Sequence, residues 1–414
     1  MKILVVGGGG REHAIVWKLS QSPKKPQIFC APGNAGIAQL ATCVPIKATD
    51  LDGICDYIKK EGFDLVVVAP DDPLVMGLVD RIEAMGVRAF GPRACAAIIE
   101  GSKVFSKDLM KKYSIPTAGY EVFENSADAI DYVSRGTFPA VIKAEGLALG
   151  KGVIIAENLE VAKAAIIDIM ENKKFGSAGA RVVVEDFLTG PEISVLAFTD
   201  GKTLIPMCSA QDHKRALDGD RGLNTGGMGA FSPSPVYTDE IAKECIQNIF
   251  MPTMNAMNAE GRTFKGVLYF GLMSTPNGVK VIEYNARFGD PETQAVLPRL
   301  KTDLLEIFEA VIDERLDQMN IEWYDDAAVC IIAASGGYPE SYEKGYPISG
   351  IENAGLVFHS GTAQKDGQFV TNGGRVLGVT AMGATMSEAI DKAYENNKNI
   401  NFEKMHYRTD IGRK

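Results

Sequence analysis

Short apolar runs alternate with amphipathic stretches over the first ninety or so residues. The apolar runs predict strands at 3–6, 27–30, 65–69 and 87–90, and the stretches between them predict helices at 14–20, 51–60 and 74–85. An alternation of strands and helices is typical of a parallel, doubly wound sheet. Such sheets bind ligands at the carboxyl ends of their strands, which are here residues 7–11, 31–36 and 70–73.

The pattern changes after residue 90. A long helix is predicted from 93 to 113, and Pro116 closes it. The unit from 117 to about 190 contains predicted strands at 140–143, 153–156 and 181–185. The first two are joined by a glycine loop without a crossover helix. This connection predicts an antiparallel hairpin and therefore an α+β unit.

Further strands follow, with a long helix predicted near 238–259. The strands predicted at 267–273 and 279–287 flank Pro276-Asn277-Gly278, a strong hairpin-turn signal. A helix is predicted at 291–315, and an antiparallel, glycine-rich unit begins near 327 and ends in a helix at 387–396. We therefore expect a multidomain protein with both α/β and α+β units.

The composition is that of a globular protein and argues against several classes of function. The 414 residues are too many for one core, and 46% hydrophobic with 23% charged residues does not indicate disorder. A net charge of −10 argues against general binding to nucleic acid or to a membrane surface. The seven cysteines form no C-x-x-C pair, and no run of about 18 apolar residues is present. We expect a cytoplasmic protein without nucleic-acid or membrane partners.

Four consecutive glycines at 7–10 follow the first predicted strand. They do not fit the dinucleotide pattern G-x-G-x-x-G, because Glu12 or His13 would occupy the third glycine position. The second strand also ends without an Asp or Glu that would hold a ribose hydroxyl. Two interpretations remain: a phosphate-binding turn that opens a helix, and a purely structural tight turn.

The segment GLALGKG at 146–152 is similar to a Walker loop but differs from it in spacing, in lacking Ser or Thr after the lysine, and in leading into a strand. We interpret it as a glycine-rich flap within a hairpin that folds over a triphosphate. Lys143 enters this flap and Lys151 lies within it, so both can face phosphate oxygens. The alternative is an exposed hairpin with incidental lysines.

The strand predicted at 281–287 carries the most specific chemistry. Because side chains alternate with a period of two, Glu283, Asn285 and Arg287 share one face. A carboxylate and an amide oxygen are hard ligands of the kind that Mg²⁺ takes together with phosphates, and the fork of Arg287 suits a phosphate. An exposed strand face would alternate in the same way. The other face is expected to pack into a core and holds Ile282, Tyr284, Ala286 and Phe288.

The residues that follow this strand predict the start of a helix. Asp290 is expected to be its N-cap and Pro291 its first residue, with Glu292 favourable to the helix dipole. We expect this cap to determine where Arg287 points.

Two other segments are candidates for binding. The polar, glycine-rich stretch at 211–229 is long for a loop without function, and His213 within it is expected to bind or position a substrate. The strand end at Glu185 leads to Phe187 and Glu192, a setting that suits an adenine ring and ribose hydroxyls. An ordinary acidic turn is the alternative for this second segment.

In this order the segments resemble the glycinamide ribonucleotide synthetases (phosphoribosylamine–glycine ligases) of the ATP-grasp superfamily. The motifs are GGGGREHA at 7–14, APGNAG at 31–36, EGSK at 100–103, QDHKR at 211–215, NTGGMGA at 224–230, RFGDPE at 287–292 and ASGGYP at 334–339. The resemblance implies a Rossmann-like N domain with a linker helix at 1–115, an ATP-grasp lid at 116–190, an ATP-grasp central domain at 191–325 and a small C-terminal domain at 326–414.

The resemblance also implies the reaction and the partners. The carboxylate of glycine attacks the γ-phosphate of ATP, and the amine of 5-phosphoribosylamine displaces phosphate from the glycyl phosphate, in purine biosynthesis. ATP and Mg²⁺ or Mn²⁺ are the implied cofactors, and the chain is expected to be a monomer or a small homo-oligomer.

The residue assignments that follow from the resemblance fall into four groups. The implied catalytic residues are Arg287, Lys151 and Asp212, and the metal ligands are Glu283 and Asn285. The implied ATP-binding residues are Lys103, Lys143, Gly150, Lys151, Gly152, Glu185, Phe187 and Glu192. The implied substrate-binding residues are Gly9, Gly10, Asn34, Ala35, Gly36, Asp71, His213, Lys214, Asn224, Thr225 and Gly226.

The chain departs from the family pattern at three positions. Glu145 and Leu149 replace an Asp and an Ala in the flap motif, and Asp71 replaces a longer carboxylate expected near the ribose. These departures concern local geometry. Two other functions are kept as alternatives: another ATP-grasp ligase or carboxylase, and a nucleotide-binding module without turnover.

Overall fold

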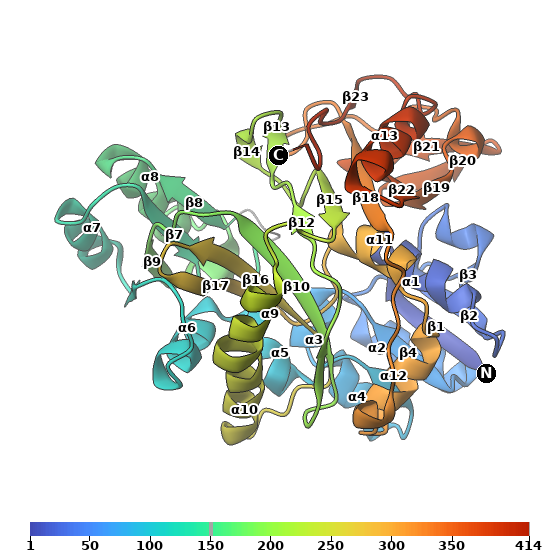
Figure 1. Cartoon of the computed structure of the whole chain (residues 1–414), viewed down its shortest axis with the longest axis horizontal. Helices are drawn as coiled ribbons and strands as arrows, with labels where there is room; N and C mark the ends of the chain where they lie inside the picture. Colours follow the sequence, from blue (N-terminus) through green and yellow to red (C-terminus); the bar gives the residue numbers. More distant parts are fainter. Residues whose placement is uncertain (149–151, 414) are drawn as a thin grey trace.

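The computed structural model describes residues 1–148 and 152–413. Its N-terminal part contains a parallel sheet in the order β3-β2-β1-β4-β5 (Figure 1). This confirms the predicted doubly wound sheet. The strands are β1 (Lys2–Gly7), β2 (Gln27–Pro32), β3 (Thr42–Cys43), β4 (Leu65–Val68) and β5 (Arg88–Phe90), and the first helices are α1 (Gly10–Ser20) and α2 (Leu51–Glu61).

Two predicted helices are each divided in the structure. The helix expected at 74–85 is α3 (Asp71–Val75) and α4 (Leu78–Ala84), separated by Gly77 with φ +86°. The long helix expected at 93–113 is α5 (Ala94–Gly101) and α6 (Lys103–Lys112). Ser102 interrupts it with an extended backbone, and its hydroxyl accepts from the N–H of Phe105 as the N-cap of α6.

The next unit is an antiparallel sheet in the order β6-β9-β7-β8, with its own small core. Its strands are β6 (Tyr120–Phe123), β7 (Ala140–Ala144), β8 (Val153–Ala156) and β9 (Val182–Asp186), and its helices are α7 (Ser126–Ser134) and α8 (Leu159–Met170). β7 and β8 pair antiparallel, as predicted. Ile142 and Val184 from the sheet pack with Ala129, Ile166 and Ile169 from the helices.

The central sheet has the order β11-β10-β16-β17. Its strands are β10 (Glu192–Thr199), β11 (Leu204–Pro206), β16 (Gly266–Thr275) and β17 (Gly278–Asn285). The predicted helix near 238–259 consists of α9 (Asp239–Cys245), the π-helical segment η3 (Ile246–Phe250) and α10 (Met251–Ala259). One core joins this sheet to the N-terminal sheet, since Leu4 and Val66 belong to the same cluster as Phe270 and Leu272.

The C-terminal sheet lies at the opposite side of the central sheet from α7 and α8 (Figure 1). Its path is β12-β15-β18-β22-β19, with β23 paired to β18. The strands are β12 (Gln211–Asp212), β15 (Gly229–Ser232), β18 (Ala327–Ser335), β19 (Leu356–His359), β22 (Arg375–Gly383) and β23 (Met405–His406), covered by helix α13 (Met386–Asn397).

Three smaller features complete the fold. The hairpins are β13 (Arg215–Leu217) with β14 (Arg221–Asn224), and β20 (Thr362–Lys365) with β21 (Gln368–Thr371). The helix predicted at 291–315 is not continuous and consists of α11 (Glu292–Val296), the 3₁₀ turn η4 (Leu297–Arg299) and α12 (Leu304–Ile312). Within the described part of the chain, no helix has the length and apolar character needed to span a bilayer.

Candidate active site

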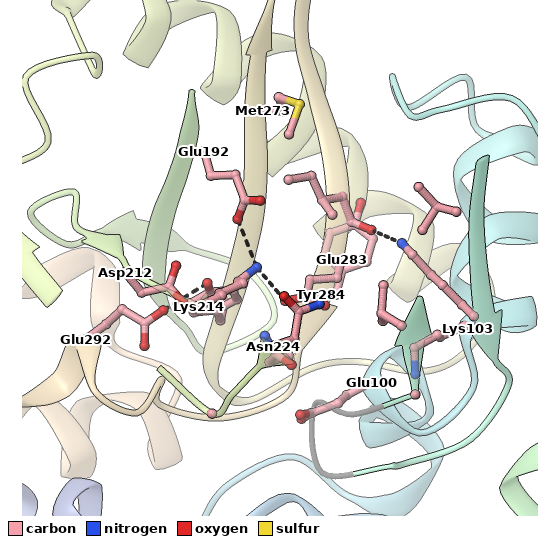
Figure 2. A pocket seen from close by; sticks show the side chains of 18 of the residues that line it. Glu100, Lys103, Glu192, Asp212, Lys214, Asn224, Met273, Glu283, Tyr284 and Glu292 are labelled. Atoms are coloured by element: carbon pink, nitrogen blue, oxygen red, sulfur yellow. Dashed lines mark hydrogen bonds and ion pairs between the residues drawn. The ribbon is translucent and has the colours of Figure 1, made fainter. Parts of the chain in front are cut away.

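A pocket of about 890 Å³ lies where the central sheet, the flap-bearing sheet and the C-terminal unit meet. Figure 2 shows its charged side chains converging from several elements. Glu283, Asn285 and Arg287 line it from β17 and the residues after it, Lys103 lines it from α6, and Lys143 lines it from β7. The structure thus brings the predicted metal and phosphate ligands together.

A β-bulge in β17 determines which side chains of this strand face the pocket. Gly271 pairs with Glu283 while the next residue, Leu272, pairs with Val281, so Ile282 is an extra residue on β17. Before the bulge the buried residues are the odd-numbered Val279 and Val281. After the bulge the buried residues are even-numbered, starting with Tyr284. The prediction that Tyr284, Ala286 and Phe288 pack into cores is confirmed. The prediction for Ile282 is wrong, because the bulge places it at the pocket beside Glu283.

Lys214 bridges two carboxylates in the pocket (Figure 2). Its Nζ lies 2.9 Å from Glu192 Oε2 and 3.6 Å from Glu283 Oε1. Burial disfavours its ammonium, but the two carboxylates outweigh burial and raise the pKa of Lys214 above its usual range. The opposite holds for Glu283, where burial is outweighed by lysines 214, 143 and 103, so its pKa is lowered. Glu283 is therefore an ionised carboxylate at the pocket.

Asp212 lies beside this bridge on β12 (Figure 2). Burial raises the pKa of Asp212 to about 8, although Lys214 opposes the shift. Glu292 is close by and is held by the hydroxyls of Ser194 and Tyr269, which donate to its Oε1 at 3.2 and 3.0 Å. Burial therefore favours the protonated form of Asp212.

A second charged network lies between β9, β7 and α6. Glu185 is buried and forms ion pairs with two lysines. Lys107 Nζ lies 2.8 Å from its Oε2, and Lys143 Nζ lies 2.8 Å from its Oε1. Lys143 also donates to the carbonyl of Ile282 at 3.1 Å, so the network reaches the bulge. Burial lowers the pKa of Lys107 to about 8. Sequence reasoning missed Lys107, although it lies four residues after Lys103 on the same face of α6.

Arg287 is held by carboxylates from two other elements. Its Nη2 lies 2.8 Å from Glu100 Oε1 and 3.9 Å from Asp71 Oδ2. Glu100 also accepts from the N–H of Ala286 at 2.7 Å, and burial raises the pKa of Glu100 to about 7 despite Arg287. Sequence reasoning assigned no role to Glu100, which belongs to the EGSK motif at 100–103. Lys103 donates to the carbonyl of Gly146 at 3.1 Å, which connects α6 to the flap.

The N-terminal glycine loop lies next to the pocket without lining it. The N–H of Gly9 donates to Glu12 Oε2 at 2.6 Å, and a Cβ placed on Gly9 would be 3.5 Å from Asp290 Oδ2 at the pocket edge. The amide of Asn34 donates to the carbonyls of Gly8 and His359, and its oxygen accepts from two N–H groups, one of them of Gly36. Asn34 thus fixes the conformation of this loop. Ala35, which is half-buried, and Gly36, which is buried, lie in the same turn.

The polar stretch at 211–229 is ordered and packed. His213 is buried, is not among the residues that line the pocket, and its ring lies 5.7 Å from that of Phe231. Asn224, Thr225 and Gly226 do line the pocket. The hydroxyl of Thr225 donates to the carbonyl of Lys214 at 2.8 Å.

Gly226 is held by two residues of the C-terminal unit that sequence reasoning missed. Tyr338 accepts from its N–H at 3.0 Å, and Arg375 donates to its carbonyl at 2.6 Å. Arg375 also lies 3.2 Å from Asp290 Oδ2. No local pattern marks Arg375, because the loops it joins are distant in the sequence.

Asp290 does not cap a helix. Helix α11 begins at Glu292 with Pro291 as its N-cap, and no side chain caps it. Asp290 instead accepts from Gln294 at 2.8 Å and pairs with Arg375. The prediction of an Asp290 cap is wrong, because a buried guanidinium competes for this carboxylate more strongly than backbone N–H groups do.

The remaining predicted positions concern the nucleotide end. Phe187 is 37% exposed and lines the pocket together with Glu192 and Gly152. Glu145, one of the departures from the family pattern, pairs with Arg181 and accepts from Ser102 at 3.1 Å. Gly150, Lys151 and Leu149 lie outside the described residues.

The donor set fits a divalent cation that is shared with phosphates. In the described part of the chain no three His, Cys, Asp or Glu side chains gather into a metal-binding group. Glu283 and Asn285 offer two oxygen ligands beside Lys103 and Lys143. Mg²⁺ is typically held by one or two such protein groups and completes its shell with water and substrate phosphates. The residues therefore fit a metal that binds together with a nucleotide.

Comparisons with known proteins agree with this geometry. Models of the N domain, the ATP-grasp (A) domain and the C domain of phosphoribosylglycinamide synthetase match residues 1–100, 101–293 and 328–414. The chain is 50% identical over 417 residues to phosphoribosylamine–glycine ligase of Halalkalibacterium halodurans, covering 100% of this chain and 97% of the relative. It is 46% identical over 414 residues to that of Clostridium acetobutylicum, covering 100% of both.

Solved structures show the same fold. The crystal structure of phosphoribosylamine–glycine ligase from Thermotoga maritima superposes with a TM-score of 0.86 at 35% identity, covering 99% of this chain and 100% of the other. Biotin carboxylase from Campylobacter jejuni has a TM-score of 0.74 at 12% identity, covering 99% of this chain and 94% of the other, and shows likeness of fold alone.

The fold and the site define an ATP-grasp enzyme, which uses ATP with a divalent metal. Within that class, the chain belongs to the phosphoribosylglycinamide synthetase family.

Proposed function

We propose that the pocket joins glycine to 5-phosphoribosylamine, with ATP as the energy source, and releases glycinamide ribonucleotide, ADP and phosphate in purine biosynthesis. Relatives named phosphoribosylamine–glycine ligase match the whole chain, which supports this reaction. One observation in the structure carries the proposal furthest. Glu283, Asn285 and Arg287 face the same pocket as Lys103 and Lys143, which is an arrangement for transferring a phosphoryl group.

The first step brings together two anions, the glycine carboxylate and the triphosphate. Cations that are already oriented remove most of the repulsion between them. Lys103, Lys143 and Lys151 are proposed to hold the phosphates, with Gly150 and Gly152 in the flap above them. Arg287 is proposed to stabilise charge on the transferred group, since Glu100 and Asp71 fix its direction. Positioning and electrostatics can carry this step without a covalent enzyme intermediate.

Glu283 and Asn285 would hold Mg²⁺ or Mn²⁺. A metal held by these two residues would supply positive charge next to the phosphates. Lys214 keeps Glu283 ionised and directed into the pocket.

The nucleotide end is proposed to lie at the end of β9. Phe187 offers an apolar surface for adenine there, and Glu192 lies at the pocket wall for the ribose hydroxyls. Glu185 shares this end but is held by two lysines, so its contribution is to orient Lys143 toward the phosphates.

The second step needs a group that accepts a proton from the attacking amine. We assign this role to Asp212, because a carboxylate whose pKa is raised to about 8 holds a proton more readily than an ordinary one, and because it lies beside Lys214 and Glu292 in the pocket. The amine substrate is proposed to bind between this group and the N-terminal loop. The residues proposed for that substrate end are Gly9, Gly10, Asn34, Ala35, Gly36, Asp71, His213, Lys214, Asn224, Thr225 and Gly226.

We further propose a cytoplasmic location and a monomer or small homo-oligomer. The division of the chain at residues 115, 190 and 325 stays a prediction.

The test is ADP release measured with glycine and phosphoribosylamine, each omitted in turn. Release is expected only when both are present. Release with bicarbonate in place of glycine would favour a carboxylase, the fold relative named above. Binding of ATP without release of ADP under all conditions would favour a nucleotide-binding module and contradict the proposal.

A further inference from the structure

Arg408 has the largest fully buried side chain in the described part of the chain, and it belongs to the last few residues of the C-terminal unit. Burying a guanidinium is unfavourable unless its donors are all matched by acceptors. Two carboxylates supply the match. Nε and Nη2 donate to the two oxygens of Asp410 at 2.7 Å each, and Nη1 donates to Asp220 Oδ1 at 3.0 Å.

These contacts form part of a larger set between residues 406–410 and the β13–β14 hairpin, which we name the tail clasp. Arg408 Nη1 also donates to the carbonyl of Arg215 at 3.0 Å. The N–H of Gly219 donates to Asp410 Oδ2 at 2.8 Å, and the N–H of Thr409 donates to Asp218 Oδ1 at 2.8 Å. In Figure 1 the last part of the chain runs beside β13 and β14, where Thr409 and Asp410 contact the hairpin.

The tail clasp has a rigid base. Met405 and His406 form β23, which pairs with β18 in the C-terminal sheet. Ile411 is fully buried in the core between α13 and β18. The hydroxyl of Tyr394 on α13 accepts from the N–H of Ile411 at 2.8 Å and donates to the carbonyl of Arg408 at 3.0 Å. The tail is therefore fixed on both sides of Arg408.

The β13–β14 hairpin, in contrast, has few stabilising apolar contacts of its own. Across the described residues, none of 215–224 belongs to a hydrophobic core cluster, and Leu217 and Leu223 are about half exposed. An isolated two-stranded hairpin is marginally stable at best. Its turn also holds Asp220 at φ +52°, a left-handed conformation that needs support from its surroundings. The tail clasp supplies that support.

The hairpin matters because it forms a wall of the active-site pocket. Arg215, Asp220 and Asn224 line the pocket, and the chain continues into Gly226, which Arg375 ties to Asp290. Asp290 lies next to Gly9 of the N-terminal loop. This wall is therefore continuous with the end that we assign to phosphoribosylamine. The nucleotide end is built mainly by other elements, namely α6, β7, β9 and β17.

We propose that Arg408 is a positioning residue for the amine substrate: through the tail clasp it holds the β13–β14 hairpin in the conformation that closes the phosphoribosylamine end of the pocket. The inference rests on the proposed function for the identity of the substrate. Its geometric content, that the tail fixes the hairpin, is independent of that identity.

The experiment compares Arg408→Met and Asp218→Ala in the full-length enzyme. The loss of one or two hydrogen bonds to the hairpin is expected to raise the KM for phosphoribosylamine about tenfold. The KM for ATP is expected to stay within about twofold, because the nucleotide end does not touch the clasp. Arg408→Lys should recover part of the loss, since it restores the charge without the planar fork. The matched control is Arg413→Met, an arginine of the same tail that contacts Asp391 and Tyr394 rather than the hairpin.

A second measurement needs no turnover. Trypsin cleavage after Arg221, an exposed residue of β14, is expected to become faster in Arg408→Met and Asp218→Ala but not in Arg413→Met. If Arg408→Met does not fold, Asp218→Ala decides, because Asp218 is only half-buried and lies outside the pocket. Folded variants with wild-type KM and wild-type cleavage would overturn the proposal, and so would an equal rise in both KM values. A wild type that fails to ligate contradicts the proposed function alone, and the cleavage assay still tests the clasp.

Discussion

The end of the pocket proposed for the nucleotide and the end proposed for the amine substrate are held in shape by different means. At the nucleotide end, Lys143 and Glu185 project from the paired strands β7 and β9, and Lys107 completes a buried ion network. At the other end, the wall is a small hairpin fixed by a tail. The first end depends on charge balance within strands and a helix, and the second depends on contacts between distant segments. Substitutions at the first end should therefore affect chemistry and stability, whereas those at the second should affect substrate binding.

The largest effect is expected at Glu283. Glu283→Gln removes the charge of the proposed metal ligand while keeping its shape, so kcat is expected to fall by about 10³-fold or more. The protein should still fold, because Glu283 faces the pocket rather than a core. Kinetics over a range of Mg²⁺ concentrations together with thermal melting measure both effects. Glu244→Gln is the control, since Glu244 accepts from the N–H of Val279 at the far end of the same strand. Near-normal activity of Glu283→Gln at limiting Mg²⁺ would refute the ligand assignment.

The next effect concerns Lys107. Lys107→Met leaves Glu185 buried with one of its two cations, which is expected to cost about 3 kcal/mol of unfolding free energy. Adding Glu185→Gln should cost less than the two single changes together, because the pair acts as a unit. Urea unfolding of the single and double variants measures this coupling. Lys111→Met serves as the control, because Lys111 also lies over the ring of Tyr120 but one turn further along α6. Additive effects would show that the buried network is not coupled.

The third effect is a dependence of stability on pH. Burial raises the pKa of Glu100 to about 7, above its unfolded value. The folded state therefore binds more protons between about pH 4.5 and 7, and stability is lost as pH rises through this range, by at most about 3 kcal/mol. Urea unfolding of the ligand-free protein at several pH values is the measurement. Glu100→Gln should flatten this part of the profile, and an unchanged slope would assign it to other groups.

The smallest effect is expected at Glu145. Its contacts with Arg181 and Ser102 are half-exposed, so Glu145→Ala is expected to reduce the free energy of unfolding by only about 1 kcal/mol. Thermal melting checks the stability. Asp is the residue of the family pattern at this position. The free energy of unfolding of Glu145→Asp should lie between those of the wild type and of Glu145→Ala, because the shorter side chain reaches Arg181 less well. A loss as large as that of Lys107→Met would remove the distinction between exposed and buried charge pairs.

Much of the nucleotide end could be predicted because its signals are local. The alternation along β17 is a pattern of period two, and it correctly placed Glu283, Asn285 and Arg287 together. The antiparallel hairpin of β7 and β8 followed from the absence of a crossover helix between them. The parallel N-terminal sheet followed from strand–helix alternation.

The other features of the site depend on contacts between residues that are distant in the sequence, and no local pattern predicts such contacts. Arg408 meets Asp220 across 188 residues of chain, and Arg375 meets Asp290 across 85. The cap expected at Asp290 failed because of this second contact. The breaks at Gly77 and Ser102 were also missed, because helical periodicity continues across them while the backbone conformation of single residues does not.

The bulge at Ile282 has a consequence for changes in chain length. The extra residue leaves the pairing on both sides of it unchanged, because Leu272 pairs with Val281 and the neighbouring Gly271 pairs with Glu283. Deleting Ile282 would therefore leave a regular ladder in which Glu283, Asn285 and Arg287 still face the pocket, and it would remove only the local bend of the strand. Deleting a paired residue such as Tyr284 would instead turn Asn285 and Arg287 to the opposite face. The one position of this segment whose loss the alternation absorbs is thus the one that the partner strand does not pair.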